Sequence, residues 1–586
     1  TPHQVRGRLS SNEEKFWLPR TPGFEERGAV SPNGAAGRLI RGASLFVGVF
    51  CLFSLVTVLF LWPCISHLHT ALIGPPEDNM NDFWDTWYAI MARNPAHFFQ
   101  TDLLRFPEGT SLVYQSFAWP QVFAVVVLSR VFGTNMGTLV ALQNVTLLGS
   151  FPLAGVGAFY LVRHFVQSTF GSLIGGFVFA FNPSHVAQAM HHAGVSSIEF
   201  LPFFALAYLV ALERRSAIWI AVAAAFYALS ALSCWYYLFY GAYFMGFHLL
   251  YARVREGAWP SGWQLAAPAL CILCTVAVLS PLIVPMALAA RQSIYEPGGN
   301  IFVADLLAYI VFPPEHLLSG LSRGFYARLP GHPWEATVYL GLVNLAVLGW
   351  QCRRTGLSRT SPMFYVLFGM VFFGILACGE SLHIAGISTH LPLPDAGLDR
   401  LPFFANVRTP SRAIVFVYLF MSIGIGFAIA SLLQRRQFAA TVGAAALAAL
   451  MVVDFYPANL AATHVTRPPG LRVLQLDPDR GFGVLDLPWG YAEEDAYMLE
   501  QVYHRRPIVD GMTTRNMGNT LLDRLSLTDL SKQREQLAHA HVKYILLHRP
   551  KNGFYGWNKE LAPRAQFLKT YRAVYDGPDM TVLRVY

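Results

Sequence analysis

The chain has 586 residues, of which 54% are hydrophobic and only 13% are charged, whereas an ordinary soluble domain carries roughly 25% charged residues. This composition excludes a soluble globular protein and predicts an integral membrane protein. The formal charge of +8 does not indicate nucleic-acid binding, because the basic residues lie mainly in short loops beside apolar segments, as the positive-inside rule requires.

A basic, polar extension, residues 1–42, precedes the first apolar span, residues 43–62. That span has about 20 residues without a charge, which is enough to cross a hydrocarbon core of about 30 Å. The extension is too long to be the short basic leader of a cleavable signal peptide. We therefore expect a signal anchor that is retained, with a cytoplasmic N-terminus.

The first external loop, residues 63–137, interleaves carboxylates with aromatic side chains: Glu77, Asp78, Asp82, Trp84, Asp85 and Trp87. A carboxylate near the membrane can accept the proton of an attacking hydroxyl, and tryptophans can anchor the loop at headgroup depth or stack on a sugar. The alternative is a solvated loop with an interfacial aromatic belt. Residues 119–133 are short and include Arg130, so they predict a re-entrant or interfacial helix.

Further spans are predicted along the chain at residues 138–162, 168–181, 199–213, 216–232, 236–252, 264–289, 336–352, 361–378, 413–433 and 438–455. The transmembrane domain is thus expected over residues 43–455, with about 11 spans. With that number every basic loop between spans is cytoplasmic. Residues 63–137, 182–198, 290–335, 380–412 and everything after 456 are then external.

The second external loop contains His191 and His192, and Glu199 follows at the start of the next span. Adjacent histidines in a helix point about 100° apart and cannot easily share one ion. We therefore assign no metal site and no certain cofactor, and leave a divalent metal open. Hydrogen-bond donation from His192 to a phosphate or a sugar hydroxyl is an equally valid interpretation.

Two later external loops carry charged residues that suit a phosphate or sugar ligand. Arg408 and Arg412 can donate paired hydrogen bonds to phosphate oxygens, and anionic lipid headgroups are the alternative partner. Asp305 and Glu335 lie in the loop before the next span. Each of these carboxylates either supports a substrate or pairs with a loop arginine.

The last 130 or so residues change character, with strand-like runs at 482–487 and 542–547 and a charge-rich helical stretch at 523–541. They predict an external α/β domain over residues 456–586. Charge is nearly balanced from residue 467 onward, with 17 Lys and Arg against 14 Asp and Glu, and the region contains no cysteine. No nucleic-acid footprint and no internal disulfide are expected there.

Taken in order, these motifs resemble bacterial multispanning glycosyltransferase-like membrane proteins of the GT-C type. Asp78 occupies the position of the family's first-loop Asp, Trp84 and Trp87 its aromatic positions, and residues 106–109 (Phe-Pro-Glu-Gly) its turn. Later positions with counterparts in the family are His192, Glu199, Asp305, Glu335, Arg408 and Arg412. Residues 485–488 and 504–507 resemble its external tail.

This resemblance implies an all-α polytopic membrane fold and inverting sugar transfer from a polyprenyl-phosphate-linked donor to a glycan, lipid or protein acceptor. Asp78 would be the catalytic base, with Arg408, Arg412 and His192 on the donor phosphate and Glu199, Trp84, Trp87, Asp305 and Glu335 in support. The expected location is the bacterial cytoplasmic (inner) membrane, with the C-terminal domain in the periplasm and available to protein partners.

Two other functions stay open. One is a non-catalytic membrane subunit that retains this scaffold and holds a partner complex through its external domain. The other is a lipid or sugar transporter, which would need a polar path through the spans. No internal repeat of the kind found in many transporters is visible in the sequence.

Overall fold

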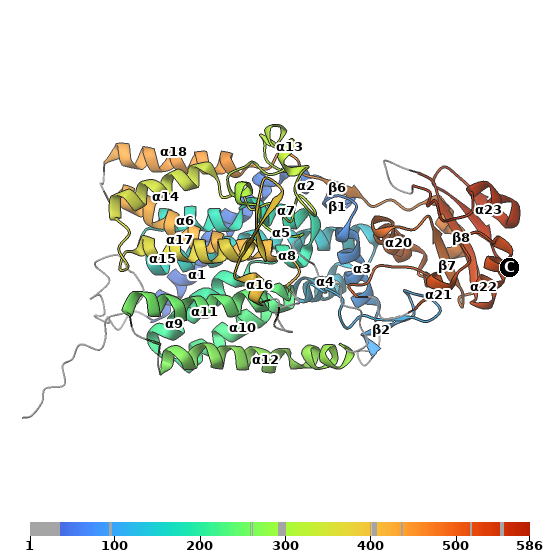
Figure 1. Cartoon of the computed structure of the whole chain (residues 1–586), viewed down its shortest axis with the longest axis horizontal. Coiled ribbons are helices and arrows are strands. Elements are labelled where there is room, and N and C mark those ends of the chain that lie inside the picture. The colour runs from blue at the N-terminus through green and yellow to red at the C-terminus, as the bar shows by residue number, and fades with distance from the viewer. Residues whose placement is uncertain are drawn as a thin grey trace, which may run out of the picture.

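The computed structural model describes residues 35–586 apart from 93–96, 258, 261, 291–300, 399, 401–406, 435–436, 516–518 and 551–555. Most of the basic extension predicted at residues 1–42 therefore lies outside the described residues. The molecule is elongated, with a bundle of helices at one end and a small sheet near the C-terminus at the other (Figure 1).

Helices form over each of the predicted apolar runs. The bundle consists of α1 (Ala35–Phe60), α5 (Met136–Phe165), α6 (Thr169–Ala180), α9 (Phe200–Arg214), α10 (Ala217–Ser233), α11 (Tyr236–Glu256), α12 (Trp263–Ala289), α14 (Leu342–Thr355), α15 (Pro362–Ala377), α17 (Ile414–Leu433) and α18 (Phe438–Phe455). The segment expected not to cross forms α4 (Trp119–Phe132), which packs against α5.

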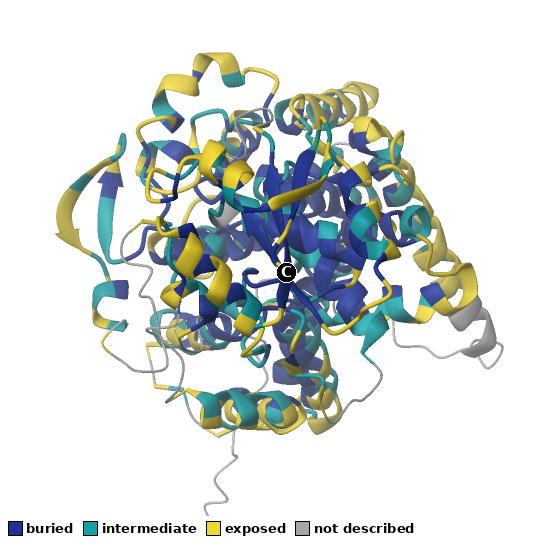
Figure 2. Cartoon of the chain, turned by 90° about the vertical axis from the view of Figure 1, so that its right-hand side faces the viewer, coloured by how far each residue is buried: buried dark blue, intermediate teal, exposed yellow. Residues whose placement is uncertain are grey.

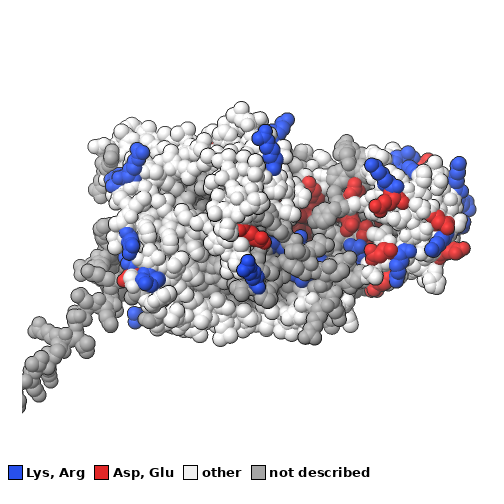
Figure 3. Space-filling view, viewed as in Figure 1, with Lys and Arg blue, Asp and Glu red and all other residues white. Residues whose placement is uncertain are grey.

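Within the described residues, 5 helical segments are long and apolar enough to cross a membrane: Gly42–Phe60, Met136–Phe165, Trp263–Ala289, Pro410–Leu433 and Phe438–Phe455. They identify the chain as a membrane protein. The face seen in Figure 3 agrees with this, because most of the helical part is uncharged and the acidic side chains gather towards the C-terminal end. The full number of about 11 spans stays a prediction.

Helix α17 forms the centre of the bundle and is buried along almost its whole length. Its closest neighbour is α6, where Gly171 and Gly175 are spaced one helical turn apart. A Cβ atom on Gly175 would lie 2.7 Å from the carbonyl oxygen of Ser422, and one on Gly171 would lie 2.9 Å from that of Gly426. These glycines let the two backbones approach, as small residues do in membrane helix pairs.

The segments between the bundle helices, and the segment after α18, contain short elements: α2 (Trp62–Ile65), β1 (Ala71–Ile73), α3 (Asp78–Met91), β2 (Gln100–Thr101), β3 (Thr110–Ser111), α7 (Pro183–His191), α8 (Ala193–Ser196), η3 (Leu306–Tyr309), η4 (Ser319–Leu321), α13 (Arg323–Tyr326), β4 (Ser381–Ile384), β5 (Ile387–Pro392), α16 (Asp395–Leu398), η6 (Pro410–Ala413) and β6 (Ala462–His464). Strand β1 pairs with β6 in antiparallel register. This pairing ties the first loop to the chain that follows α18.

The C-terminal region contains η7 (Pro469–Leu471), α19 (Arg472–Leu476), β7 (Gly483–Leu487), α20 (Tyr491–His504), α21 (Leu521–Arg524), α22 (Leu530–His539), β8 (Val542–His548), α23 (Arg564–Thr570), β9 (Arg572–Asp576) and β10 (Met580–Arg584). Its sheet has the order β7-β8-β10-β9, in which only β7 and β8 are parallel. The two runs expected as strands from sequence are thus β7 and β8. Strands β7 and β8 are buried along their whole length (Figure 2).

Helix α20 follows β7 in the chain and packs against α3 of the first loop. Because of this contact, the acidic face of the first loop lies at the junction between the bundle and the C-terminal region. That junction contains the candidate site.

Candidate functional site

Asp78 is the first residue of α3, and its carboxylate contacts a histidine that lies between α7 and α8. The Oδ2 atom of Asp78 lies 2.9 Å from Nδ1 of His192. His192 has an extended backbone conformation between α7 and α8. The side chains of Asp78 and His192 remain 23% and 21% exposed, so a ligand can still reach the pair.

The other nitrogen of the same ring reaches a third segment of the chain. Nε2 of His192 lies 3.3 Å from Oε1 of Glu335, and Glu335 accepts two hydrogen bonds from the guanidinium of Arg412, of which the Nε bond measures 3.1 Å. Nε2 of Gln188 donates a further hydrogen bond of 3.0 Å to Glu335. Four alternating charges, Asp78, His192, Glu335 and Arg412, therefore form one chain of contacts, which we call the charge chain.

The charge chain fixes the ionisation of its members. Burial alone would lower the pKa of His192, but the hydrogen bonds and charges of Asp78 and Glu335 raise it to about 10. Burial opposes ionisation of Asp78 too, yet its bond to His192 holds its pKa below the ordinary value. The pKa of Glu335 is likewise lowered, against its burial, by Arg412 and His192. At neutral pH both carboxylates are thus ionised and His192 is protonated.

The two adjacent histidines contact different carboxylates. Nδ1 of His191 lies 2.9 Å from Oε2 of Glu77. Its ring stacks on that of Trp334, with 3.9 Å between the ring centroids. Glu77 is thus engaged by His191, which leaves Asp78 as the partner of His192.

Asp82 and Asp85 lie deeper on the same helix. Oδ2 of Asp82 accepts a hydrogen bond of 2.7 Å from the backbone amide of Ala193, and burial raises the pKa of Asp82 to about 7. Asp85 is buried, accepts a hydrogen bond of 3.0 Å from Gln115 and has a pKa raised well above its ordinary value by burial. Both residues support the loop from within.

Trp84 and Trp87 occupy a different place from the one expected. Trp84 is 0% exposed and Trp87 is 4% exposed, so neither can anchor the loop in headgroups or stack on a sugar. Nε1 of Trp84 instead donates a hydrogen bond of 2.7 Å to Oε1 of Gln501 on α20. The apolar face of α3 is covered by the C-terminal region, which is why these rings are internal.

The other predicted supporting residues are not joined to the charge chain by any contact among the described residues. Glu199 precedes α9 and accepts a hydrogen bond of 2.9 Å from Ser197. Asp305 caps η3 through the amide of Leu307 and accepts a second bond, of 2.8 Å, from the amide of Gly386. Asp305 therefore connects its loop to the turn between β4 and β5.

Arg408 differs from Arg412 in its partners. The described residues include no ion-pair partner for Arg408, and its Nε atom is buried without a hydrogen bond. Arg412 is held by Glu335 and also lies over the ring of Tyr236, with 4.7 Å between Cζ and the ring centroid. Of the two predicted phosphate ligands, Arg408 thus has the freer guanidinium.

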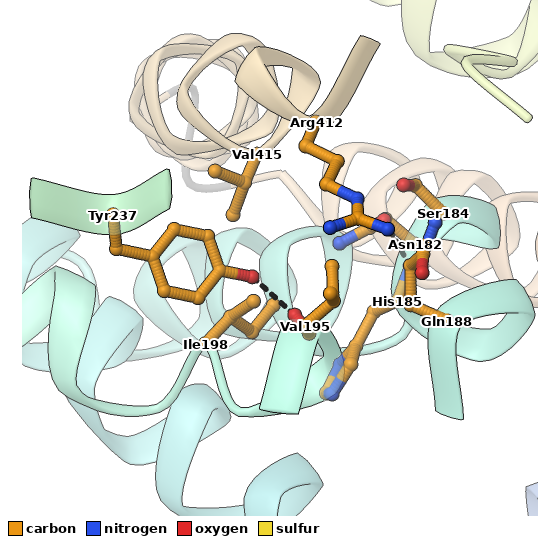
Figure 4. Close-up of a pocket in the computed structure, with 9 residues that line it drawn as sticks. All are labelled: Asn182, Ser184, His185, Gln188, Val195, Ile198, Tyr237, Arg412 and Val415. Atoms are coloured by element: carbon orange, nitrogen blue, oxygen red, sulfur yellow. Dashed lines mark hydrogen bonds between the residues drawn. The ribbon is translucent and has the colours of Figure 1, made fainter. Parts of the chain in front are cut away.

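A small cavity of about 20 Å³ lies beside the charge chain (Figure 4). Its lining includes Asn182, Ser184, His185, Gln188, Tyr237 and Arg412. The hydroxyl of Tyr237 donates to the carbonyl oxygen of Val195 and closes one side. A cavity of this volume holds about one water molecule, so it can hydrate Arg412 but cannot hold a sugar.

Sequence reasoning missed two members of the site. Gln188 precedes His192 by one turn of helix, so helical spacing could have indicated it. Asp495, on α20, is 1% exposed, and neither carboxyl oxygen has a hydrogen-bond partner among the described residues. Burial and the negative charges of Asp78, Glu494, Asp82 and Glu77 raise its pKa well above the ordinary value. Nothing in the sequence distinguishes it from the neighbouring acidic residues.

Residues 48–456 match a protein family described as "Domain of unknown function (DUF6311)". No curated protein matches the sequence of the chain.

Among solved structures, the chain is similar to arabinofuranosyltransferase AftD from Mycobacteria in a mutant form, with 13% identity over 92% of the chain and a TM-score of 0.56. A second AftD structure gives 12% identity, 92% coverage and a TM-score of 0.53. In both comparisons the chain spans about two-fifths of AftD, 41% and 40% of its length.

The chain is also similar to the archaeal oligosaccharyltransferase AglB from Archaeoglobus fulgidus, in complex with an inhibitory peptide and a dolichol-phosphate. Here the identity is 13%, the TM-score is 0.50, and the match covers 86% of the chain and 69% of AglB. AftD and AglB are GT-C glycosyltransferases, so the expected GT-C-like fold is confirmed. At this level of identity the likeness establishes the fold alone.

Proposed function

The chain belongs to the family described as "Domain of unknown function (DUF6311)", and since that description names no activity, we propose one from the geometry of its own site. The protein is a membrane glycosyltransferase that moves a sugar from a polyprenyl-phosphate-linked donor to an acceptor. The observation that carries this proposal is the charge chain, in which an ionised and accessible Asp78 is held by His192.

In the proposed step, a hydroxyl of the acceptor attacks the anomeric carbon of the donor sugar. A new carbon–oxygen bond forms, the bond to the phosphate oxygen breaks, and its electron pair leaves with the lipid phosphate. The hydroxyl proton passes to the carboxylate of Asp78. Attack opposite the leaving phosphate inverts the anomeric centre.

The other members of the site have separate roles in this proposal. Arg408 binds the leaving phosphate, because its guanidinium has no carboxylate partner among the described residues and guanidinium matches phosphate oxygens. Arg412 and Glu335 orient His192, which in turn orients Asp78 and adds positive charge beside it. His192 and Arg412 thereby stabilise negative charge that develops on the phosphate.

The orientation in the membrane follows from the positive-inside rule. His192 precedes α9 and Glu335 precedes α14, whereas Arg214 and Arg353 lie in the last turns of those same helices. The charge chain and the basic residues are therefore at opposite ends of the bundle. We place the basic end in the cytoplasm, and the charge chain and the C-terminal α/β domain, residues 456–586, outside the inner membrane.

The test is sugar transfer by the full-length protein in lipid nanodiscs, with a panel of radiolabelled polyprenyl-phosphate hexoses and pentoses as donors and a membrane glycan extract as acceptor. Wild-type protein should release polyprenyl phosphate with at least one donor. Asp78→Asn should lower the rate by about 100-fold or more. Asp85→Asn is the matched control and should retain activity, because burial already favours the neutral form of Asp85.

Two results would overturn the proposal. Full turnover by the Asp78→Asn variant would exclude Asp78 as the base. Absence of turnover with every donor, in a wild-type protein that copurifies with a stable partner complex, would favour the non-catalytic subunit.

A further inference from the structure

Three ionisable side chains meet inside the C-terminal region, apart from the charge chain. They are Asp486 on β7, Glu500 on α20 and His548 at the end of β8. One ligand atom from each of them lies within 4.8 Å of the others. The side chains of Asp486 and His548 are each 2% exposed and that of Glu500 is 13% exposed. This is a compact buried group of one imidazole and two carboxylates.

The topology of the sheet explains why these three side chains lie close together. Strands β7 and β8 are parallel, and Asp486 is in register with Leu546. Because side chains alternate along a strand, His548 lies on the same face as Leu546 and hence as Asp486. Helix α20 covers this face and brings the ring of Tyr497 to 4.6 Å from that of His548. Ligands of open α/β sheets commonly bind at the carboxyl ends of the strands.

Two further atoms in this region lack partners among the described residues. They are Oδ2 of Asp486 and Nε2 of His504, in residues that are only 2% and 3% exposed. His504 follows Glu500 by four positions on α20, so the two side chains lie on one face of the helix. A buried polar atom with no partner costs free energy, which a bound ligand would recover.

We propose that Asp486, Glu500 and His548 bind one divalent transition-metal ion of the Zn²⁺ class. Mixed imidazole and carboxylate donors suit such ions. Metal binding would displace the proton that Nε2 of His548 shares with Oδ1 of Asp486, which are 2.9 Å apart. The two atoms would then move apart to more than about 3 Å, the separation that a tetrahedral metal requires of its ligands. It would join β7, β8 and α20 in a region whose sequence contains no cysteine for a disulfide.

The competing arrangement is metal-free. Nδ1 of His548 lies 3.9 Å from Oε1 of Glu500 while Nε2 faces Asp486. A protonated imidazole between two carboxylates would satisfy the same geometry. The two arrangements differ in one measurable property, because only the first binds a metal and releases a proton as it does so.

The full-length protein, purified in detergent without chelator, should be analysed by elemental mass spectrometry before and after incubation with Zn²⁺ and gel filtration. We expect about one equivalent of Zn²⁺ per chain, the number that a single site holds. Chelation should lower the melting temperature by about 5 °C or more, and Zn²⁺ should restore it. Added Co²⁺ should give visible absorption bands of a four- or five-coordinate site.

His548→Gln and Asp486→Asn should each lose the metal, whereas His539→Gln, at an exposed position on α22, should keep it. If the first two variants fail to fold, the Co²⁺ spectrum and the chelator response of the wild-type protein still distinguish the metal site from the metal-free ion pair. Less than about 0.1 equivalent after incubation with Zn²⁺, together with a melting temperature that chelator does not change, would overturn the proposal in favour of the ion pair.

Discussion

Trp84 and Gln501 are 417 positions apart in the chain, yet Nε1 of Trp84 donates a buried hydrogen bond of 2.7 Å to Oε1 of Gln501. This bond fastens the loop after α1 to α20 of the C-terminal region. Nε2 of Gln501 also donates to the carbonyl oxygens of Leu103 and Arg506. The helix that begins with Asp78 is therefore positioned by residues near the end of the sequence.

Trp84→Phe should destabilise the protein, because it leaves the buried Oε1 of Gln501 without a donor. A buried unsatisfied polar group costs about 1–3 kcal/mol. The measurement is the free energy of unfolding of the full-length protein in detergent. Trp62→Phe, at a position that is 58% exposed, is the control and should change little. An equal effect of both substitutions would contradict the proposed fastening.

The stability that His192 contributes should depend on pH. Its pKa is raised to about 10 in the folded protein, from an unfolded value of about 6.5. The contribution is fully present below the unfolded pKa and is lost as the pH rises through the folded one. The difference in melting temperature between wild type and His192→Gln should therefore shrink between pH 7 and about pH 10. A constant or growing difference would contradict the charge chain.

Replacing Arg408 and Arg412 by Gln should affect different properties of the protein. Arg412→Gln leaves Glu335 buried and without its bidentate partner, and breaking a buried ion pair costs about 3–5 kcal/mol. Arg408→Gln removes no ion pair among the described residues, so stability should be retained while KM for the donor rises about tenfold or more. Unfolding assays and donor titrations distinguish the two. A stability loss confined to Arg408→Gln would contradict these roles, in which Arg412 holds a buried ion pair and Arg408 binds the donor.

Gly175→Ala should destabilise the bundle, because the added Cβ would lie 2.7 Å from the carbonyl oxygen of Ser422. Overpacking of this kind costs about 1–3 kcal/mol. Gly149→Ala on α5 is the matched control: nothing lies within 4 Å of its added Cβ, so helix propensity should stabilise it by up to about 1 kcal/mol. Thermal unfolding in detergent measures both. Equal responses would show that α6 and α17 do not pack closely there.

The apolar helical runs and the strands β7 and β8 could be predicted because their signals are local. A run of apolar residues of the right length or period identifies a helix or strand without reference to the rest of the chain. The candidate members of the site were also recognisable as charged residues in loops on one predicted side. Their pairing was not, since adjacent residues such as His191 and His192 take different partners.

The exposure of the first loop was predicted least well. Aromatic residues between carboxylates are compatible with a membrane belt, a sugar platform or a buried face, and the sequence of α3 does not discriminate among them. Trp84 and Trp87 are internal because α20 covers them. That contact depends on how the C-terminal region docks, which no local pattern encodes.

The sequence by itself determined a membrane protein with apolar helical runs, loop charges that favour one orientation, and a mixed C-terminal region, because burial of apolar surface is legible in composition and periodicity. Only the tertiary structure decided that Asp78 meets His192, that Glu335 lies between His192 and Arg412, and that Asp495 faces the first loop. Those contacts join segments that are far apart in the sequence. Their geometry is set by helix packing rather than by any nearby residue.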